Sequence, residues 1–184
     1  VANVFGGIKL LIVDRAFRVG DWVETPSVGE GIIEEVTLST VKIRKFSKAI
    51  QTVPNGVIAA EPIINWSRAP NRRIKMDIGL VYGTSNEQFK TILVKLTEFI
   101  ASDDRVDHSV TQMVHMVGFG ASSIDINVNY FTKITDWEGF RGIVEEHMLA
   151  FIEIVENAGS SMAFPTRTIH IEDGNPRQFS EGQE

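Results

Sequence analysis

The chain has 184 residues, of which 43% are hydrophobic and 23% are charged, a composition typical of a folded protein with one ordinary domain or two small ones. It contains no cysteine, which excludes both a disulfide framework and a thiolate zinc site. Its formal net charge of -6 argues against a general nucleic-acid-binding surface, which carries an excess of lysine and arginine.

A first helix is predicted in the apolar segment at residues 1–13, where Val4, Ile8 and Leu11 recur at helical spacing. No segment of the chain reaches the about 20 apolar residues that span a bilayer, so we interpret this one as a half-buried helix at a boundary. A simple N-terminal core helix is the alternative that the residues leave open. The chain begins with Val1 rather than methionine and lacks the pattern of a secretory signal, so we expect a piece of a longer protein with further sequence upstream.

Short strands are predicted between residues 17 and 68, where alternating apolar residues are separated by turn residues. A Pro54-Asn55-Gly56 corner and a small apolar turn separate the last two strands. Several short strands at this spacing predict a small β-barrel. The predicted strands cover residues 32–38, 41–46, 50–53 and 63–66.

Strands and helices then follow in the order β-α-β-β-α-β, which is that of a ferredoxin-like α/β sandwich. Ser85 and Asp136 are predicted to cap the two helices at their N-termini, and Gly159 is predicted to end the second helix. The strands are predicted at residues 74–82, 110–117, 124–130 and 166–171, and the helices at residues 89–100 and 137–155.

Patterns of catalytic and metal-binding residues are missing from the sequence. The four histidines fall in four predicted elements, and no two have the i, i+4 spacing that places two imidazoles on one helix face. Ser122 and Ser123 lack the G-x-S-x-G spacing of a nucleophile turn. Neighbouring residues of a strand point to opposite faces, so Glu34 and Glu35 are expected not to converge on one substrate. We therefore predict no enzymatic activity, no metal site and no cofactor.

A series of short motifs in the same order resembles the small-conductance mechanosensitive channel (MscS) family, from residue 3 to about residue 173. The two most specific are Val53-Pro54-Asn55-Gly56 and Asn65-Trp66-Ser67-Arg68, which resemble the family's VPNG corner and N-x-S-R strand end. Residues 14–23 resemble the family's R-P-F-x-x-G-D-x-V segment, with Ala16 in place of the proline. Further similarities lie at residues 3–7, 30–40, 77–82, 120–124 and 164–165.

The resemblance implies a homoheptameric channel of the cell inner (plasma) membrane that is opened by membrane tension and releases ions and small solutes on hypo-osmotic shock. This chain would supply the α+β cytoplasmic part of each subunit, which encloses a vestibule with side portals. The implied parts are the lower half of the pore-lining helix (1–16), a small Sm-like barrel (17–68), the α/β domain (69–165), a strand of an intersubunit barrel (166–173) and a flexible tail (174–184).

The resemblance also implies groups of functional residues. Asn3, Gly6 and Gly7 would belong to the gating helix, in which each glycine lowers the helix propensity by about 1 kcal/mol relative to alanine. Asn3 would contact Gly56 of the corner. The candidates for portal charge are Lys42, Arg44, Lys45 and Lys48, and those for the C-terminal barrel are Ile169, His170 and Ile171.

Two other classes of function stay open at this point. The first is a soluble ring-forming module that binds a protein partner or RNA through its small barrel, although the acidic balance disfavours RNA. The second is an enzyme on the ferredoxin-like fold, for which the sequence offers no catalytic constellation. The sequence favours the channel subunit, with further copies of itself, membrane lipids and permeant ions as partners and no nucleic acid.

Overall fold

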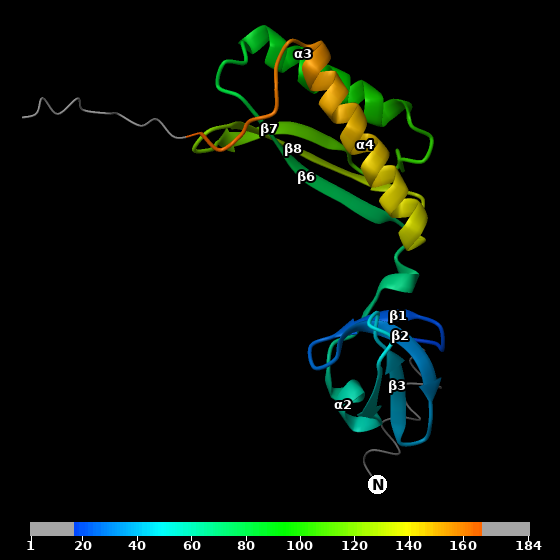
Figure 1. Cartoon of the computed structure of the whole chain (residues 1–184). Helices are drawn as coiled ribbons and strands as arrows, with labels where there is room; N and C mark the ends of the chain where they lie inside the picture. The colour runs from blue at the N-terminus through cyan, green and yellow to red at the C-terminus, as the bar shows by residue number, and fades with distance from the viewer. Residues whose placement is uncertain (1–16, 167–184) are drawn as a thin grey trace, which may run out of the picture. The chain divides into compact units, whose positions relative to one another are not determined.

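The computed structural model describes residues 17–166, which contain a five-stranded and a three-stranded sheet (Figure 1). Contacts divide the chain into two compact units. Of the described residues, the first unit contains residues 17–74, 103–111 and 130–146. The second unit contains residues 75–102, 112–129 and 147–166. The domain bounds expected from the sequence stay a prediction.

The five-stranded sheet lies in the first unit and has the strand order β4-β3-β2-β1-β5, with antiparallel pairing throughout. Its register pairs Val23 with Gly31 and Val41 with Val53. Strands β1 and β3 alternate buried and more exposed residues, as a sheet with one buried face requires. The strands are β1 (Trp22–Thr25), β2 (Gly29–Val36), β3 (Thr40–Arg44), β4 (Ile50–Pro54) and β5 (Ile64–Asn65).

The core beneath this sheet is aliphatic apart from Phe17, which is also buried. Val23, Ile33 and Ile43 are each 1% exposed, and Ile58 of the short helix α2 (Asn55–Ala60) packs into the same core at 2%. Full burial of one such side chain stabilises a fold by about 1.5–3 kcal/mol. The small all-β part predicted from the alternating pattern is confirmed.

A β-bulge in β2 overturns the expectation for the adjacent glutamates. The register passes from Ile33 opposite Ile43 to Glu35 opposite Lys42, which leaves Glu34 as the extra residue. Such an insertion resets the alternation of the strand, so both glutamates lie on the exposed face. The prediction that they point to opposite faces is wrong because it assumed a regular strand.

The corner after β4 is helical rather than a simple turn. Pro54 precedes α2 with a φ of -59°, a value that proline presets and that suits the start of a helix. The strand predicted beyond the corner is only two residues long and continues as the 3-10 turn η2 (Trp66–Arg68).

Two apolar residues for which the alternation predicts strands lie in turns instead. Leu38 and Phe46 are 69% and 56% exposed. Leu38 sits in a turn that Thr37 closes, because the Thr37 hydroxyl donates to the Thr40 carbonyl oxygen at 3.0 Å. Hydroxyl groups that bond to nearby backbone compete with strand pairing, which the apolar pattern alone does not reveal.

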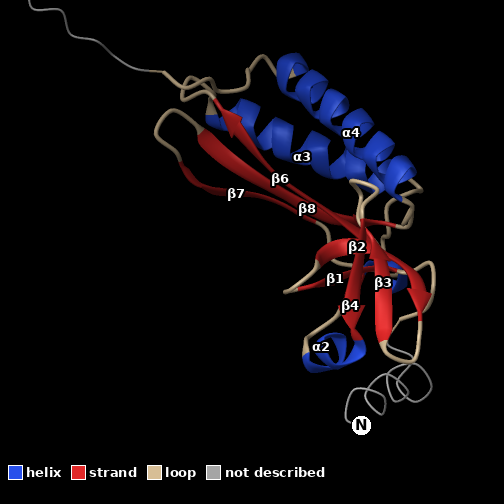
Figure 2. Cartoon of the chain, turned by 60° about the horizontal axis from the view of Figure 1, so that its bottom comes forward, coloured by secondary structure: helices blue, strands red, loops and turns tan. Residues whose placement is uncertain are grey.

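The three-stranded sheet has the order β6-β8-β7, and the two long helices lie on one of its faces (Figure 2). This order and the βαββα succession are those of a ferredoxin-like fold, so the predicted fold class is confirmed. An isolated antiparallel bridge joins Leu80 to Met162 at the outer edge of β6. The elements are β6 (Arg72–Leu80), α3 (Asn86–Ser102), β7 (Met113–Phe119), β8 (Ile124–Thr132) and α4 (Trp137–Asn157).

The predicted helix ends are confirmed. The backbone N–H of Gln88 donates to Ser85 Oγ at 3.3 Å and the Ser85 N–H donates to Gln88 Oε1 at 2.9 Å, which is a reciprocal capping box. Asp136 Oδ2 accepts from the Gly139 N–H at 2.6 Å at the start of α4. Gly159 has a φ of 74° just beyond the end of α4, a value that glycine adopts without strain.

Candidate functional site

The asparagine of the VPNG motif holds the corner in place. Asn55 is 1% exposed, its backbone N–H donates to the Ser39 carbonyl oxygen at 2.9 Å, and its Nδ2 donates to the Thr37 carbonyl oxygen at 3.0 Å. Both acceptors lie in the turn between β2 and β3. Asn55 therefore ties the first turn of α2 to that turn, and it positions Gly56, which is half-buried in α2.

The other members of the predicted gating group, Asn3, Gly6 and Gly7, lie outside the described residues. The same holds for the C-terminal barrel candidates Ile169, His170 and Ile171. The contact between Asn3 and Gly56 and the intersubunit barrel thus stay predictions.

Two of the four portal candidates form ion pairs on the outer face of β2 and β3. The Nζ of Lys42 lies 2.6 Å from Oε2 of Glu35, and Nη2 of Arg44 lies 2.6 Å from Oε1 of Glu34. The hydrogen bond to Glu35, aided by its charge, raises the pKa of Lys42 above the ordinary value. These pairs follow from the bulge, which puts both glutamates beside the two cations.

The other two portal candidates differ from each other. The Lys45 Nζ donates to the carbonyl oxygen of Val28, at the β1–β2 turn. Lys48 is exposed and has a backbone φ of 73°, in the left-handed region. Within the described part of the chain its ammonium group donates to no acceptor, and its carbonyl oxygen accepts from Arg44 at 3.1 Å.

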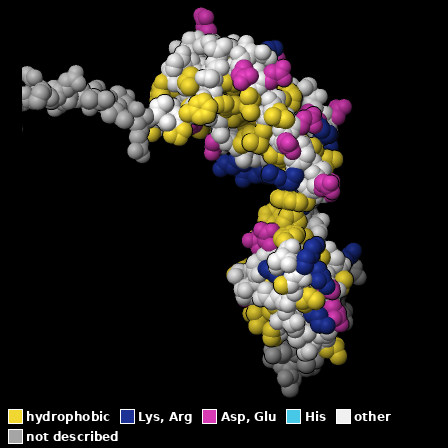
Figure 3. Space-filling view, in the orientation of Figure 1, with side chains coloured by type: hydrophobic (Ala, Val, Ile, Leu, Met, Phe, Trp, Pro, Cys, Tyr) yellow, Lys and Arg dark blue, Asp and Glu magenta, His cyan; other side chains and the backbone are white. Residues whose placement is uncertain are grey.

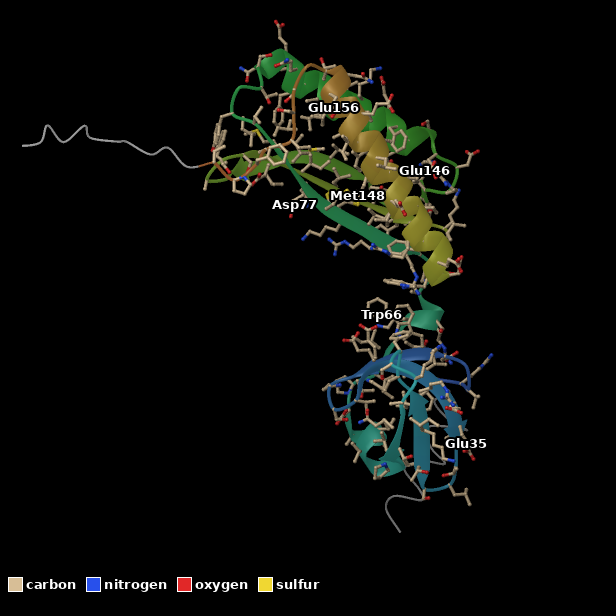
Figure 4. All side chains as sticks on the ribbon, in the orientation of Figure 1. Glu35, Trp66, Asp77, Glu146, Met148 and Glu156 are labelled. Atoms are coloured by element: carbon tan, nitrogen blue, oxygen red, sulfur yellow. The ribbon has the colours of Figure 1, made fainter. Side chains whose placement is uncertain are left out.

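A cavity of about 430 Å³ lies in the first unit and is walled mainly by aromatic rings. All three tryptophans of the chain line it, from β1, from η2 (Figure 4 labels Trp66) and from the start of α4. The ring centroid of Trp22 lies 6.0 Å from that of Trp66 and 5.6 Å from that of Trp137, the latter edge to face. Phe131 and Phe140 complete the aromatic walls.

Arg72, at the start of β6, is stacked among these rings. Its guanidinium carbon lies 4.6 Å from the ring centroid of Trp22, 5.7 Å from that of Trp137 and 5.9 Å from that of Phe140. Its Nε donates to the carbonyl oxygen of Thr135. Stacking on several π-faces stabilises the cation and fixes the plane of the guanidinium.

Hydrogen bonds anchor the tryptophans around the cavity. The Trp22 backbone N–H donates to Ser67 Oγ at 2.8 Å, and Trp66 Nε1 donates to Glu24 Oε2 at 3.0 Å. These bonds fix the positions of two of the cavity walls.

Asn71, a further lining residue, is held by Asp107. Its Nδ2 donates to Asp107 Oδ2 at 2.7 Å, while the side chain and backbone N–H of Ser109 donate to Oδ1 at 2.6 and 2.9 Å. Hydrogen bonds to its charged form, first from Ser109 and then from Asn71, lower the pKa of Asp107.

Sequence reasoning missed this cavity. Trp22, Trp66 and Trp137 are separated by more than 40 residues in each case, so no short motif contains two of them. The one local signal is the basic cluster that follows Trp66, which by itself suggests only a charged surface.

Neither a metal centre nor a membrane span is found in the described range. Between residues 17 and 166 no three histidine, aspartate or glutamate side chains lie close enough together to hold a metal ion. Over the same residues no helix combines the length and the hydropathy that crossing a bilayer requires.

Comparison with known families gives two matches that follow each other along the chain. Residues 1–68 match the domain described as "Mechanosensitive ion channel, beta-domain". Residues 74–162 match the domain described as "Mechanosensitive ion channel MscS, C-terminal". Both descriptions are of channels and not of enzymes.

Comparison with individual proteins also points to mechanosensitive channels of this kind. The chain is 34% identical to an uncharacterized MscS family protein of Aquifex aeolicus, over 92% of this chain and 46% of that protein. It is 32% identical to the low conductance mechanosensitive channel YnaI of Escherichia coli, over 96% of this chain and 51% of YnaI. Among solved structures, Arabidopsis thaliana MSL1 superposes with a TM-score of 0.82 at 23% identity, over 89% of this chain and 58% of MSL1. The chain spans about half the length of the Aquifex aeolicus and Escherichia coli relatives.

Proposed function

The chain belongs to the small-conductance mechanosensitive channel (MscS) family, and on this premise we propose that it is part of the subunit of an ion channel opened by membrane tension. The observation that carries the proposal is the match of two family domains in the same order, over residues 1–68 and 74–162. The all-β sheet and the ferredoxin-like sheet correspond to these two matches. The channel releases ions and small solutes on hypo-osmotic shock.

The proposed gate acts through membrane area. Tension favours the state that occupies more area in the membrane, and a helix that lines the pore couples that area to the pore radius. In this chain the helix at residues 1–16, with Asn3, Gly6 and Gly7, forms the lower half of the pore lining. Its contact with Gly56 at the corner connects the gate to the small all-β domain, and the anchoring of α2 by Asn55 supports such a role.

The proposed assembly is a homoheptamer. Exposed apolar side chains in the second unit support an assembly of several copies, because monomeric proteins seldom expose large apolar patches. Figure 3 shows hydrophobic side chains gathered on the part that contains α4. Strand β7, at one end of its sheet, has Val117 at 60% and Phe119 at 71% exposure, and Leu149 of α4 is 62% exposed. An assembly would bury these groups and pair the open strand edges.

The chain forms the proposed cytoplasmic vestibule, below the inner membrane and open to the cytoplasm through side portals. Permeant ions pass the portals, and membrane lipids are further proposed partners of the subunit. Of the portal candidates, Lys48 best fits a role in ion selectivity. Lys42 and Arg44 are neutralised by carboxylates within 2.6 Å, whereas Lys48 is exposed and forms no such pair in the described range.

A survival assay tests the proposed function. The full-length protein is produced in bacteria that lack their own mechanosensitive channels, and the cells are diluted rapidly into water. We expect more cells to survive than with an empty vector. Equal survival, with the protein detected in the membrane fraction, would argue against release of solutes by this protein.

A mass measurement tests the assembly separately. The full-length protein is extracted in a mild detergent and the mass of the intact particle is determined by light scattering. Seven subunits are expected. A monomer or dimer would contradict the heptamer while leaving the survival assay to decide on the channel.

A further inference from the structure

The VPNG corner contains the only asparagine–glycine step of the chain, Asn55-Gly56. Asparagine is a chemically labile residue, and it is most labile before glycine in an open peptide. The backbone nitrogen of the next residue attacks the side-chain carbonyl carbon, and glycine has no Cβ to obstruct this attack. The most labile amide side chain of the sequence thus lies at the start of α2, directly after β4 (Figure 2).

The fold holds Asn55 away from this reaction. The attack requires the backbone nitrogen of Gly56 to reach the side-chain carbon, whereas helical backbone and two hydrogen bonds fix Asn55 as the first residue of α2. Its Nδ2 donates to the Thr37 carbonyl oxygen at 3.0 Å, and its backbone N–H donates to the Ser39 carbonyl oxygen at 2.9 Å. Asn55 is only 1% exposed, which also keeps water from the amide. The reaction therefore needs the corner to open.

Opening of the corner permits a complete deamidation. The Gly56 backbone nitrogen loses its proton and forms a bond to Cγ of Asn55, and the Cγ–Nδ2 bond breaks with release of ammonia. Water then opens the resulting cyclic imide at either of its carbonyl carbons. The product carries aspartate or isoaspartate in place of Asn55, and the released ammonia makes the step irreversible.

The product cannot form the bonds that hold the corner. A carboxylate only accepts hydrogen bonds, so the oxygen that replaces Nδ2 would face the Thr37 carbonyl oxygen with no proton between them. The second oxygen gains no donor either, because Oδ1 of Asn55 is buried and accepts no hydrogen bond within residues 17–166. An unpaired buried charge is strongly unfavourable. Isoaspartate also inserts an extra carbon into the main chain between β4 and α2.

We propose that Asn55 is a deamidation site that the fold protects, and that its conversion permanently prevents the corner from closing. Each opening of the corner exposes the amide to the reaction, and a converted chain loses the attachment of α2 to the turn between β2 and β3. The proposal does not rest on the channel function, since all the residues concerned belong to this corner.

Peptide mass spectrometry tests the site and its protection. The unmodified 184-residue chain is incubated at mildly alkaline pH, in buffer or in guanidinium chloride, and its peptides are scored for conversion of amide to acid. Asn55 should convert at least about tenfold more slowly in the folded chain, because the rate follows the open fraction. In guanidinium chloride Asn55 should convert faster than any other asparagine. Equal rates in the two solvents, or faster conversion of another asparagine in guanidinium chloride, would overturn the proposal.

A substitution at Gly56 tests the attacking atom. Gly56→Ala places a Cβ beside the backbone nitrogen and should slow the conversion of Asn55 in guanidinium chloride by at least about tenfold. Ala59→Gly, in the same helix, is the matched control and should leave that rate unchanged. Because both rates are measured on the unfolded chain, the stability of the variants does not enter. An unchanged rate in Gly56→Ala would refute attack by the Gly56 nitrogen.

Asn55→Asp tests whether conversion is permanent. Its urea midpoint at about pH 7 should be lower than that of Asn55→Ala, because the alanine only loses the donor whereas the aspartate also buries a charge. Protonation would restore a donor towards Thr37, so the deficit relative to the unmodified chain should shrink as the pH falls towards about 4. Asn86→Asp, at the exposed first residue of α3, is the matched control. An Asn55→Asp midpoint equal to that of the unmodified chain at about pH 7 would contradict the proposal.

Discussion

The side-chain Nδ2 of Asn55 donates to the carbonyl oxygen of Thr37 at 3.0 Å and thereby fixes the first turn of α2 against the turn between β2 and β3. The Asn55 backbone N–H adds a second bond to Ser39 at 2.9 Å. α2 also carries Gly56, the proposed contact of the gating helix. The packing of one buried asparagine thus determines where the proposed gate would meet the small all-β domain.

Replacement of Asn55 by alanine should lower the free energy of unfolding by about 2 kcal/mol, because it leaves the partly buried carbonyl oxygen of Thr37 without its donor. Urea titration of the chain measures the change. Asn157→Ala, at the exposed end of α4, is the control and should change the free energy by less than about 0.5 kcal/mol. Equal losses in the two variants would contradict the structural role of Asn55.

Substitution at Gly56 should alter how the channel current decays under sustained tension. Gly56→Ala adds a side chain at the proposed contact and raises the helix propensity of α2 by about 1 kcal/mol. Ala59→Gly, at an exposed position of the same helix, lowers the helix propensity without touching the proposed contact. Current decay in patches of the full-length protein should change in the first variant only. The same decay rate in Gly56→Ala and the unmodified protein would speak against the contact.

The hydrogen bonds from Ser109 make the stabilisation by Asp107 depend on pH. They lower the pKa of Asp107 in the folded chain, so its contribution is fully present above the unfolded pKa of about 3.9 and is lost as the pH falls through the folded value. Ser109→Ala removes the strongest donor. The difference in urea midpoint between the two chains should be constant above about pH 5 and shrink below about pH 4. A difference in urea midpoint that grows as the pH falls would contradict the lowered pKa of Asp107.

Neutralisation of Lys48 should shift the selectivity of the channel towards cations. Lys48→Gln removes a positive charge that forms no ion pair within residues 17–166, and a shift of roughly a few millivolts in the reversal potential across a salt gradient is expected. Lys90→Gln, an exposed lysine of α3 that is not a portal candidate, is the control. Equal reversal potentials in the Lys48 variant and the unmodified channel would remove Lys48 from the portal candidates.

The fold was accessible from the sequence where local signals agree with one another. Ser85, Asp136 and Gly159 mark helix ends through bonds to residues a few positions away, and such local chemistry is visible in the sequence. The alternation in β1 and β3 likewise predicts the buried face. The alternation rule fails at Glu34 and Glu35, because a bulge depends on how two strands pair.

The aromatic cavity shows what local patterns do not contain. Trp22, Trp66 and Trp137 come from separate parts of the chain, and their meeting depends on tertiary packing around Arg72. The VPNG corner was recognisable as a motif, yet its basis, a buried Asn55 bonded to a turn 18 positions earlier, becomes evident only in the folded chain.

Recording currents from the full-length protein in liposome patches under rising suction tests the proposed channel most directly. Discrete openings are expected, with an open probability that rises with tension at constant voltage. Escherichia coli YnaI, measured in the same lipids, shows that the patches transmit tension. Patches that contain the protein but stay silent until they rupture, where YnaI opens, would contradict a tension-gated channel.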